Sequence, residues 1–204
     1  MTGFAAVVLA GGAGRRMGGV DKPTRPVGGT PMRDRVLAAV ADATPRIVVG
    51  ATGSPPSGVR DTREQPPGGG PVAATAAGLA LVTEHADPGT TTVALLAADL
   101  PLLTTAAVRN LRTVLARSGT ADGAVYLDET GRQQWLCGVW RLASLRDALA
   151  RLAARHDGVL TGTSMRALMA ELTVTGVAWG GAGPPPWFDC DTDDDLRRAE
   201  EWIR

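Results

Sequence analysis

The sequence predicts an α/β protein with one mostly parallel sheet that is covered by helices on both faces. Three observations indicate this class. Short apolar runs alternate with segments of helical periodicity, the first run ends in a glycine-rich loop, and no linker or internal repeat divides the 204 residues. Strands that are buried on both faces are apolar along their whole length, as these runs are. We therefore expect a single domain over residues 1–204.

The first half of the chain is expected to hold three strands and two helices. Apolar runs predict the strands, at residues 5–9, 47–49 and, in a weaker pattern, 59–63. Thr30 is expected to cap a helix that has Pro31 in its first position and apolar side chains at helical spacing. An alanine-rich segment predicts the second helix over residues 72–85.

The second half continues the alternation. Further strands are expected at residues 92–98, 124–127, 134–140 and 174–178. The second and third of these flank a turn over residues 128–131, which predicts a hairpin. The expected helices begin at Thr104 or Thr105, span residues 142–154 and 164–172, and close the chain after Thr192.

Composition argues against several classes of protein. The 21 basic and 21 acidic residues cancel, so we expect no binding of nucleic acid through a basic surface. The apolar runs are far shorter than a membrane span and the first residues do not resemble a secretory signal, so we expect a cytoplasmic protein without a membrane partner. Cys137 and Cys190 form no C-x-x-C pair, which argues against a zinc module. The oligomeric state stays open.

The loop after the first expected strand is the most informative segment. Residues 9–22 read LAGGAGRRMGGVDK and hold five glycines and three cations. Glycines let backbone N–H groups approach phosphate oxygens, and cations add charge for the same anion. Lys22 is the only lysine in the chain, which indicates a site for a compact ammonium. Because the spacing fits neither a P-loop nor a dinucleotide fingerprint, we expect a phosphate site of another kind.

This loop resembles the signature of the MobA-like nucleotidyltransferases, and above all of the molybdenum cofactor guanylyltransferases among them. Further motifs of that family follow in order, with PGGGP at residues 67–71, Asp-x-Pro at residues 99–101 and an aromatic-Asp-x-Asp-Thr segment at residues 188–192. The resemblance implies a Rossmann-like domain that transfers a nucleoside monophosphate to an acceptor phosphate with Mg²⁺ and releases pyrophosphate. The nucleotide contacts that we expect are made by Leu9, Ala10, Gly11, Gly12, Gly14, Lys22, Glu64 and Asp99.

Three acidic residues are expected to complete the site. Glu64 lies near the position of a family acid that holds the base or ribose, and its carboxylate could accept two N–H bonds from guanine; a surface glutamate is the alternative. Asp99 follows the most apolar strand, where a carboxylate needs a strong positive partner, and we expect Mg²⁺ to be that partner; a capping or salt-bridged aspartate is the alternative. In related enzymes a residue at the place of Asp191 completes the metal or acceptor site, whereas Thr192 and Asp195 fit a capping box.

The resemblance implies transfer of GMP from GTP to the phosphate of molybdopterin. Lys22, Arg15 and Asp99 are the expected catalytic residues, because positive charge stabilises the departing pyrophosphate and phosphoryl chemistry depends on positioning. The expected magnesium ligands are Asp99 and Asp191.

Departures from the family lie around the base and the acceptor. Gly50 stands where asparagine is frequent, Asp189 and Asp191 replace two asparagines, and Gln134-Trp135 replaces His-Pro. CTP as the donor, another phosphorylated acceptor, or a non-catalytic nucleotide-binding module of cofactor biosynthesis therefore stay open.

Overall fold

A computed structural model describes residues 3–11 and 22–203. Seven strands form its main sheet: β1 (Gly3–Leu9), β4 (Arg46–Val49), β5 (Arg60–Thr62), β6 (Thr90–Ala97), β7 (Gly123–Leu127), β8 (Gln133–Arg141) and β9 (Val174–Ala178). The helices are α1 (Met32–Ala39), α2 (Pro71–His85), α3 (Thr105–Arg117), α4 (Leu142–Ala154), α5 (Met165–Met169) and α6 (Asp193–Ile203). Before α1, the chain forms a 3-10 helix, η2 (Lys22–Thr24), and a small hairpin of β2 (Pro26–Val27) and β3 (Thr30–Pro31).

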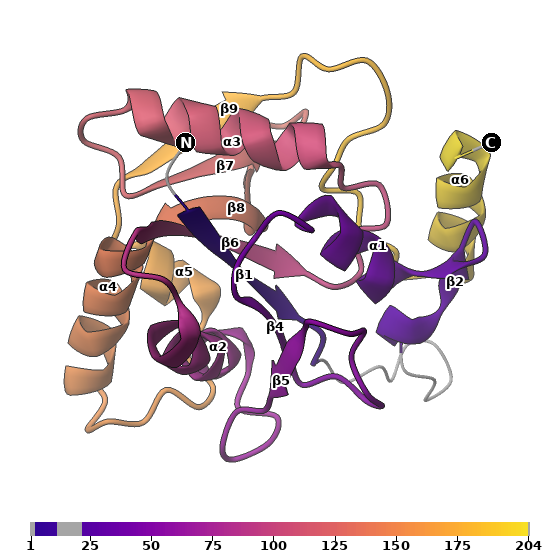
Figure 1. The fold of residues 1–204 in the computed structure, drawn as a ribbon. Coiled ribbons are helices and arrows are strands. Elements are labelled where there is room, and N and C mark those ends of the chain that lie inside the picture. The colour runs from indigo at the N-terminus through magenta and orange to yellow at the C-terminus, as the bar shows by residue number, and fades with distance from the viewer. Residues whose placement is uncertain (1–2, 12–21, 204) are drawn as a thin grey trace.

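The main sheet has the strand order β5-β4-β1-β6-β8-β7-β9 (Figure 1). Its neighbouring strands are parallel except in the pairs made by β8, which runs antiparallel to β6 and to β7. The predicted class, an α/β fold with a mostly parallel sheet, is confirmed. The chain leaves β1 for β4 on one side and later returns to β6 on the other side. Ligands of open α/β sheets bind where the strand order reverses in this way, at the carboxyl ends of the strands.

Helices lie on both faces of the sheet (Figure 1), and buried apolar side chains form one layer on each face. Along β1, Ala6 and Val8 pack into the layer beneath α1 and α3, whereas Ala5, Val7 and Leu9 pack into the layer beneath α2, α4 and α5. Successive side chains of a strand point to opposite faces, so a central strand between two helical layers must be apolar at every position. This requirement explains why the run of residues 5–9 predicted the strand.

Helix α2 lies unusually close to the sheet at Gly78. A Cβ atom built on Gly78 would lie 2.5 Å from Cγ1 of Val7 and 3.0 Å from Cγ2 of Val49. Real Cβ atoms do not approach carbon so closely, so only glycine allows this spacing between α2 and the two central strands.

Two expectations about helix ends were wrong and one was confirmed. Thr30 does not cap α1, because it pairs with Val27 in the small hairpin and Pro31 takes the N-cap position without a side-chain cap bond. Helix α5 ends at Met169, before the predicted end at residue 172. Thr104 does cap α3, since its hydroxyl accepts a bond from the N–H of Ala107 at 3.1 Å. None of the helices in the described residues is long and apolar enough to cross a membrane.

Candidate nucleotide site

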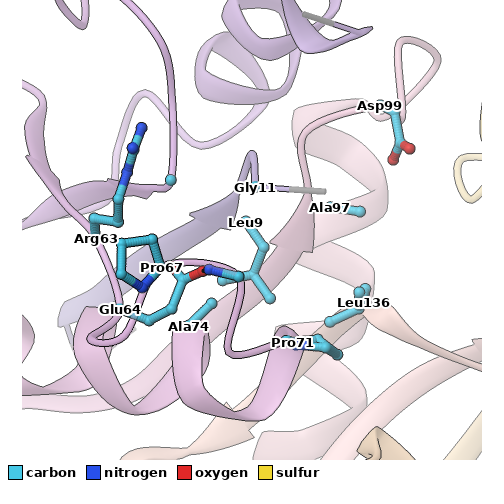
Figure 2. Close-up of a pocket in the computed structure, with 13 residues that line it drawn as sticks. Leu9, Gly11, Arg63, Glu64, Pro67, Pro71, Ala74, Ala97, Asp99 and Leu136 are labelled. Carbon is cyan, nitrogen blue, oxygen red and sulfur yellow. The ribbon is translucent and has the colours of Figure 1, made fainter. Parts of the chain in front are cut away.

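A cavity of about 630 Å³ opens at the carboxyl ends of the central strands. Its walls come from the end of β1, the loop after β5, the first turn of α2 and the end of β6. Figure 2 shows Arg63 and Glu64 on one side of this cavity and Asp99 on the other. The segments that follow β1, β5 and β6 therefore surround one space.

The floor of the cavity includes a close crossing of two backbones. Gly50 has φ +77°, a left-handed conformation, and a Cβ atom on it would lie 2.8 Å from Cα of Gly11. Gly11 itself donates its N–H to the carbonyl of Val49 at 3.2 Å. Asparagine tolerates a positive φ, but its Cβ would collide with Gly11 in this arrangement. The path of the loop therefore requires glycine at position 50, where asparagine is frequent in the family.

Glu64 is buried in the wall of the cavity, with a relative exposure of 7%. Its Oε1 atom accepts a hydrogen bond from the N–H of Gly68 at 2.9 Å. Its Oε2 atom is buried and has no hydrogen-bond partner among the residues that the structure describes. The alternative of a surface glutamate was wrong, and a buried acceptor without a donor indicates a ligand that supplies one.

A cluster of three charged side chains, Lys22, Asp99 and Asp191, joins distant parts of the chain. Nζ of Lys22 lies 2.5 Å from Oδ2 of Asp99 and 2.6 Å from Oδ1 of Asp191. Burial alone would lower the pKa of the Lys22 ammonium, but the charges and hydrogen bonds of the two aspartates outweigh it and raise the pKa above 10.5. Lys22 therefore carries its charge at neutral pH and bridges the two carboxylates.

This bridge bears on the two interpretations of Asp99. The sequence favoured Mg²⁺ as its positive partner, with a capping or salt-bridged aspartate as the alternative, and the structure pairs Asp99 with the Lys22 ammonium. Among the described residues, no group of three or more His, Cys, Asp and Glu side chains could hold a metal ion. Two carboxylates that contact one cation nevertheless fit magnesium, which is commonly held by one or two carboxylates together with substrate phosphates.

Backbone contacts fix the segment that carries Asp191. The N–H of Cys190 donates to the carbonyl of Asp99 at 3.2 Å, which ties this segment to the end of β6. Oδ2 of Asp195 accepts bonds from the N–H groups of Asp191 and Thr192 at 3.1 and 2.8 Å. The N–H of Asp195 donates in turn to the Thr192 hydroxyl, so the predicted capping box is present.

Of the remaining residues predicted to contact the nucleotide or to act in catalysis, some are described by the structure and some are not. Leu9 and Gly11 line the cavity, whereas Ala10 is buried against the core and donates its N–H to Val49. Gly12, Gly14 and Arg15 lie outside the described residues.

Neither cysteine is suited to act as a nucleophile. Burial raises the pKa of the Cys137 thiol to about 12. Burial and then the nearby acidic groups raise the pKa of Cys190 to about 12 as well. Both thiols are therefore protonated at neutral pH, and a thiol in that form is a poor nucleophile.

Sequence reasoning missed several residues of the site. Arg63 and Leu136 also line the cavity, and Arg25 pairs with Asp193 at 2.5 Å beside the lysine bridge. Arg63 directly follows β5, so the rule that ligands bind at the carboxyl ends of the strands could have found it. The pair of Arg25 and Asp193 joins residues 168 positions apart, and neither residue carries a sequence signal for the other.

An open α/β sheet with a lysine and two carboxylates beside a cavity at its carboxyl edge fits an enzyme that binds a phosphate-bearing ligand. The chain belongs to the MobA-like NTP transferase domain family, whose model matches residues 6–175. It is therefore a nucleotidyltransferase of the MobA-like family.

Relatives and solved structures agree with this membership. Molybdenum cofactor guanylyltransferases from Bradyrhizobium sp. and Acidiphilium cryptum are 29% and 33% identical to this chain, over 98% and 96% of it and 92% and 93% of their own length. The structure of molybdopterin-guanine dinucleotide biosynthesis protein A from Archaeoglobus fulgidus matches with a TM-score of 0.68 at 18% identity, over 97% of both chains. The cytidylyltransferase for 2-C-methyl-D-erythritol 4-phosphate from Thermus thermophilus also matches with a TM-score of 0.68, at 20% identity and over 98% of both chains. The fold therefore accommodates more than one base and acceptor.

Proposed function

We propose that this nucleotidyltransferase transfers GMP from GTP to the phosphate of molybdopterin and releases pyrophosphate. Relatives named molybdenum cofactor guanylyltransferase, about 30% identical over nearly the whole chain, support this choice of donor and acceptor. The observation that carries the choice of guanine is the buried Oε2 atom of Glu64, which has no hydrogen-bond partner within residues 3–11 and 22–203. Guanine presents two N–H donors on its Watson–Crick edge, from N1 and from the 2-amino group, and adenine presents neither in that arrangement.

The protein's own groups position the reactants. The bond from Gly68 engages Oε1 and leaves Oε2 to accept the N–H groups of the base, after a movement of the cavity wall that exposes this buried atom. We assign the triphosphate to the glycine-rich segment that begins at Gly11, a residue of the cavity lining, with Gly12, Gly14 and Arg15 as further expected contacts. The α-phosphorus would then lie toward the side of the cavity that Asp99 lines.

Transfer needs charge neutralisation more than covalent help. A phosphate oxygen of the acceptor forms a bond to the α-phosphorus while the bond from that phosphorus to the bridging oxygen of pyrophosphate breaks. The ammonium of Lys22 donates to phosphate oxygens and offsets the charge that develops on the pyrophosphate. Asp99 and Asp191 would hold Mg²⁺, which supplies further charge neutralisation at the phosphates when it is bound.

The test is release of pyrophosphate from GTP, CTP, ATP or UTP, each with and without molybdopterin. We expect release with GTP and molybdopterin together. Lys22→Ala should lower turnover by orders of magnitude and leave the circular dichroism spectrum unchanged. Equal release from CTP, or release with another phosphorylated acceptor instead of molybdopterin, would contradict the proposal.

Glu64→Gln tests base recognition separately. The neutral amide accepts less strongly from N–H donors, so the variant should lose affinity for GTP by more than it loses affinity for ATP. Glu84→Gln is the matched control, because the Glu84 carboxylate is exposed near the far end of α2. Equal losses for the two nucleotides in Glu64→Gln would mean that Glu64 does not read the base.

A further inference from the structure

The Lys22 ammonium contacts both carboxylates that are candidates for the metal. Both carboxylate oxygens are within hydrogen-bond distance of the same nitrogen, at 2.5 and 2.6 Å, so they are at most about 5 Å apart. Magnesium bonds to oxygen are about 2.0–2.1 Å long, so both oxygens would have to lie within about 4.2 Å of each other to bind one ion, in the same region where the ammonium contacts them. Two cations cannot share this place.

We propose that Lys22 occupies the metal position until a nucleotide draws it away, so that metal binding depends on prior or simultaneous binding of nucleotide. This inference rests on the proposed function for the identity of the nucleotide only. The bridge leaves a net charge of −1 at the two carboxylates instead of −2, which weakens the attraction for a divalent cation. A metal ion bound there would also leave the ammonium without its two carboxylate partners. The loss would be costly because the Lys22 side chain is only 16% exposed to water.

The surrounding contacts hold the bridged arrangement in place. Lys22 begins η2, and its carbonyl accepts the N–H of Arg25 at 3.1 Å, so its backbone is held. The bond from Cys190 to the Asp99 carbonyl holds the other side of the bridge. Asp99 also lines the nucleotide cavity, so phosphate oxygens placed there would offer the ammonium a new partner.

Two consequences follow for binding. Phosphate oxygens accept the ammonium, the two carboxylates become free together, and the metal then completes its ligands with phosphate oxygens. Because such coupling is reciprocal, the metal should raise the affinity for the nucleotide by the same factor as the nucleotide raises the affinity for the metal.

The decisive experiment measures binding of Mn²⁺ without nucleotide, by electron paramagnetic resonance. Mn²⁺ prefers the same oxygen ligands as Mg²⁺ and reports its own free concentration. We expect Lys22→Met to bind Mn²⁺ at least tenfold more tightly than the unsubstituted protein. Arg198→Met is the matched control, because it removes an equal charge from α6, where the guanidinium lies over Trp202, and it should change the affinity less than threefold. Asp99→Asn added to Lys22→Met should abolish the gain.

A second measurement uses the unsubstituted protein and does not depend on any variant folding. Lysine labelled with ¹³C at Cε gives one side-chain signal, because Lys22 is the only lysine. Millimolar Mg²⁺ alone should leave this signal in place, and Mg²⁺ with GTP should move it.

No gain of Mn²⁺ affinity in Lys22→Met, or movement of the signal by Mg²⁺ alone, would overturn the inference. Neither the Mn²⁺ measurement nor the Mg²⁺-only titration contains nucleotide or acceptor, so a failure of the proposed transfer reaction would leave both results interpretable.

Discussion

Replacing Asp99 by asparagine separates the ion pair's contribution to stability from its role in transfer. The side chains of Lys22 and Asp99 are 16% and 23% exposed. Their pair therefore lies between buried pairs, where loss of one partner costs about 3–5 kcal/mol, and exposed pairs, which contribute about 0–1 kcal/mol. The amide oxygen of asparagine still accepts a bond, and Asp191 still balances the ammonium. We expect the free energy of unfolding to fall by about 1–2 kcal/mol.

Urea unfolding at pH 7, followed by tryptophan fluorescence, measures this loss. Asp191→Asn is the matched comparison: its carboxylate is 53% exposed, so its replacement should cost less than about 1 kcal/mol. Asp99→Asn should also abolish pyrophosphate release, whereas Asp191→Asn should reduce it less. An Asp99→Asn protein as stable as the unsubstituted one, or more stable, would refute the assignment of Lys22 as the partner that balances Asp99.

Two further predictions concern stability away from the cavity. A Cβ atom at Gly123 would lie 2.1 Å from the ring of the fully buried Trp140, so Gly123→Ala should lower the free energy of unfolding by about 2–3 kcal/mol in urea. Gly119→Ala has open space around it and should change little. Hydrogen bonds from two arginines, Arg155 first, lower the pKa of Glu171 below its ordinary 4.5. A depressed carboxylate pKa contributes stability above 4.5 that is lost as the pH falls through the folded-state value. Glu171→Gln should therefore weaken the acid dependence of stability, and parallel pH profiles would contradict this.

The fold was predictable where burial imposes a pattern on the sequence. Strands β1, β4 and β6 lie between two helical layers, so each contains a continuous apolar run. Helix α4 matched its predicted bounds because it has apolar side chains at helical spacing. The hairpin of β2 and β3 was missed because two-residue strands are too short to show periodicity, and Thr30 then looked like a cap.

The site was predictable in its residue types more than in its contacts. Asp99 and Glu64 follow strands, and the carboxyl ends of parallel strands meet at one edge of the sheet. The contact between Lys22 and Asp191 joins residues 169 positions apart, and no local sequence pattern predicts that these two side chains meet. The free oxygen of Glu64 depends on which of its two oxygens Gly68 engages, and only the folded loop decides that.

The width of the cavity depends on a core contact, the close approach of α2 to the sheet at Gly78. Pro71 and Ala74 form part of the cavity wall, and both belong to the same rigid helix as Gly78. Because the missing side chain at Gly78 lets α2 rest directly on Val7, any larger residue there would lift the helix and carry the wall with it. Selection or engineering for a bulkier ligand could therefore act on a residue that never touches the ligand, by changing how far a helix stands from the sheet.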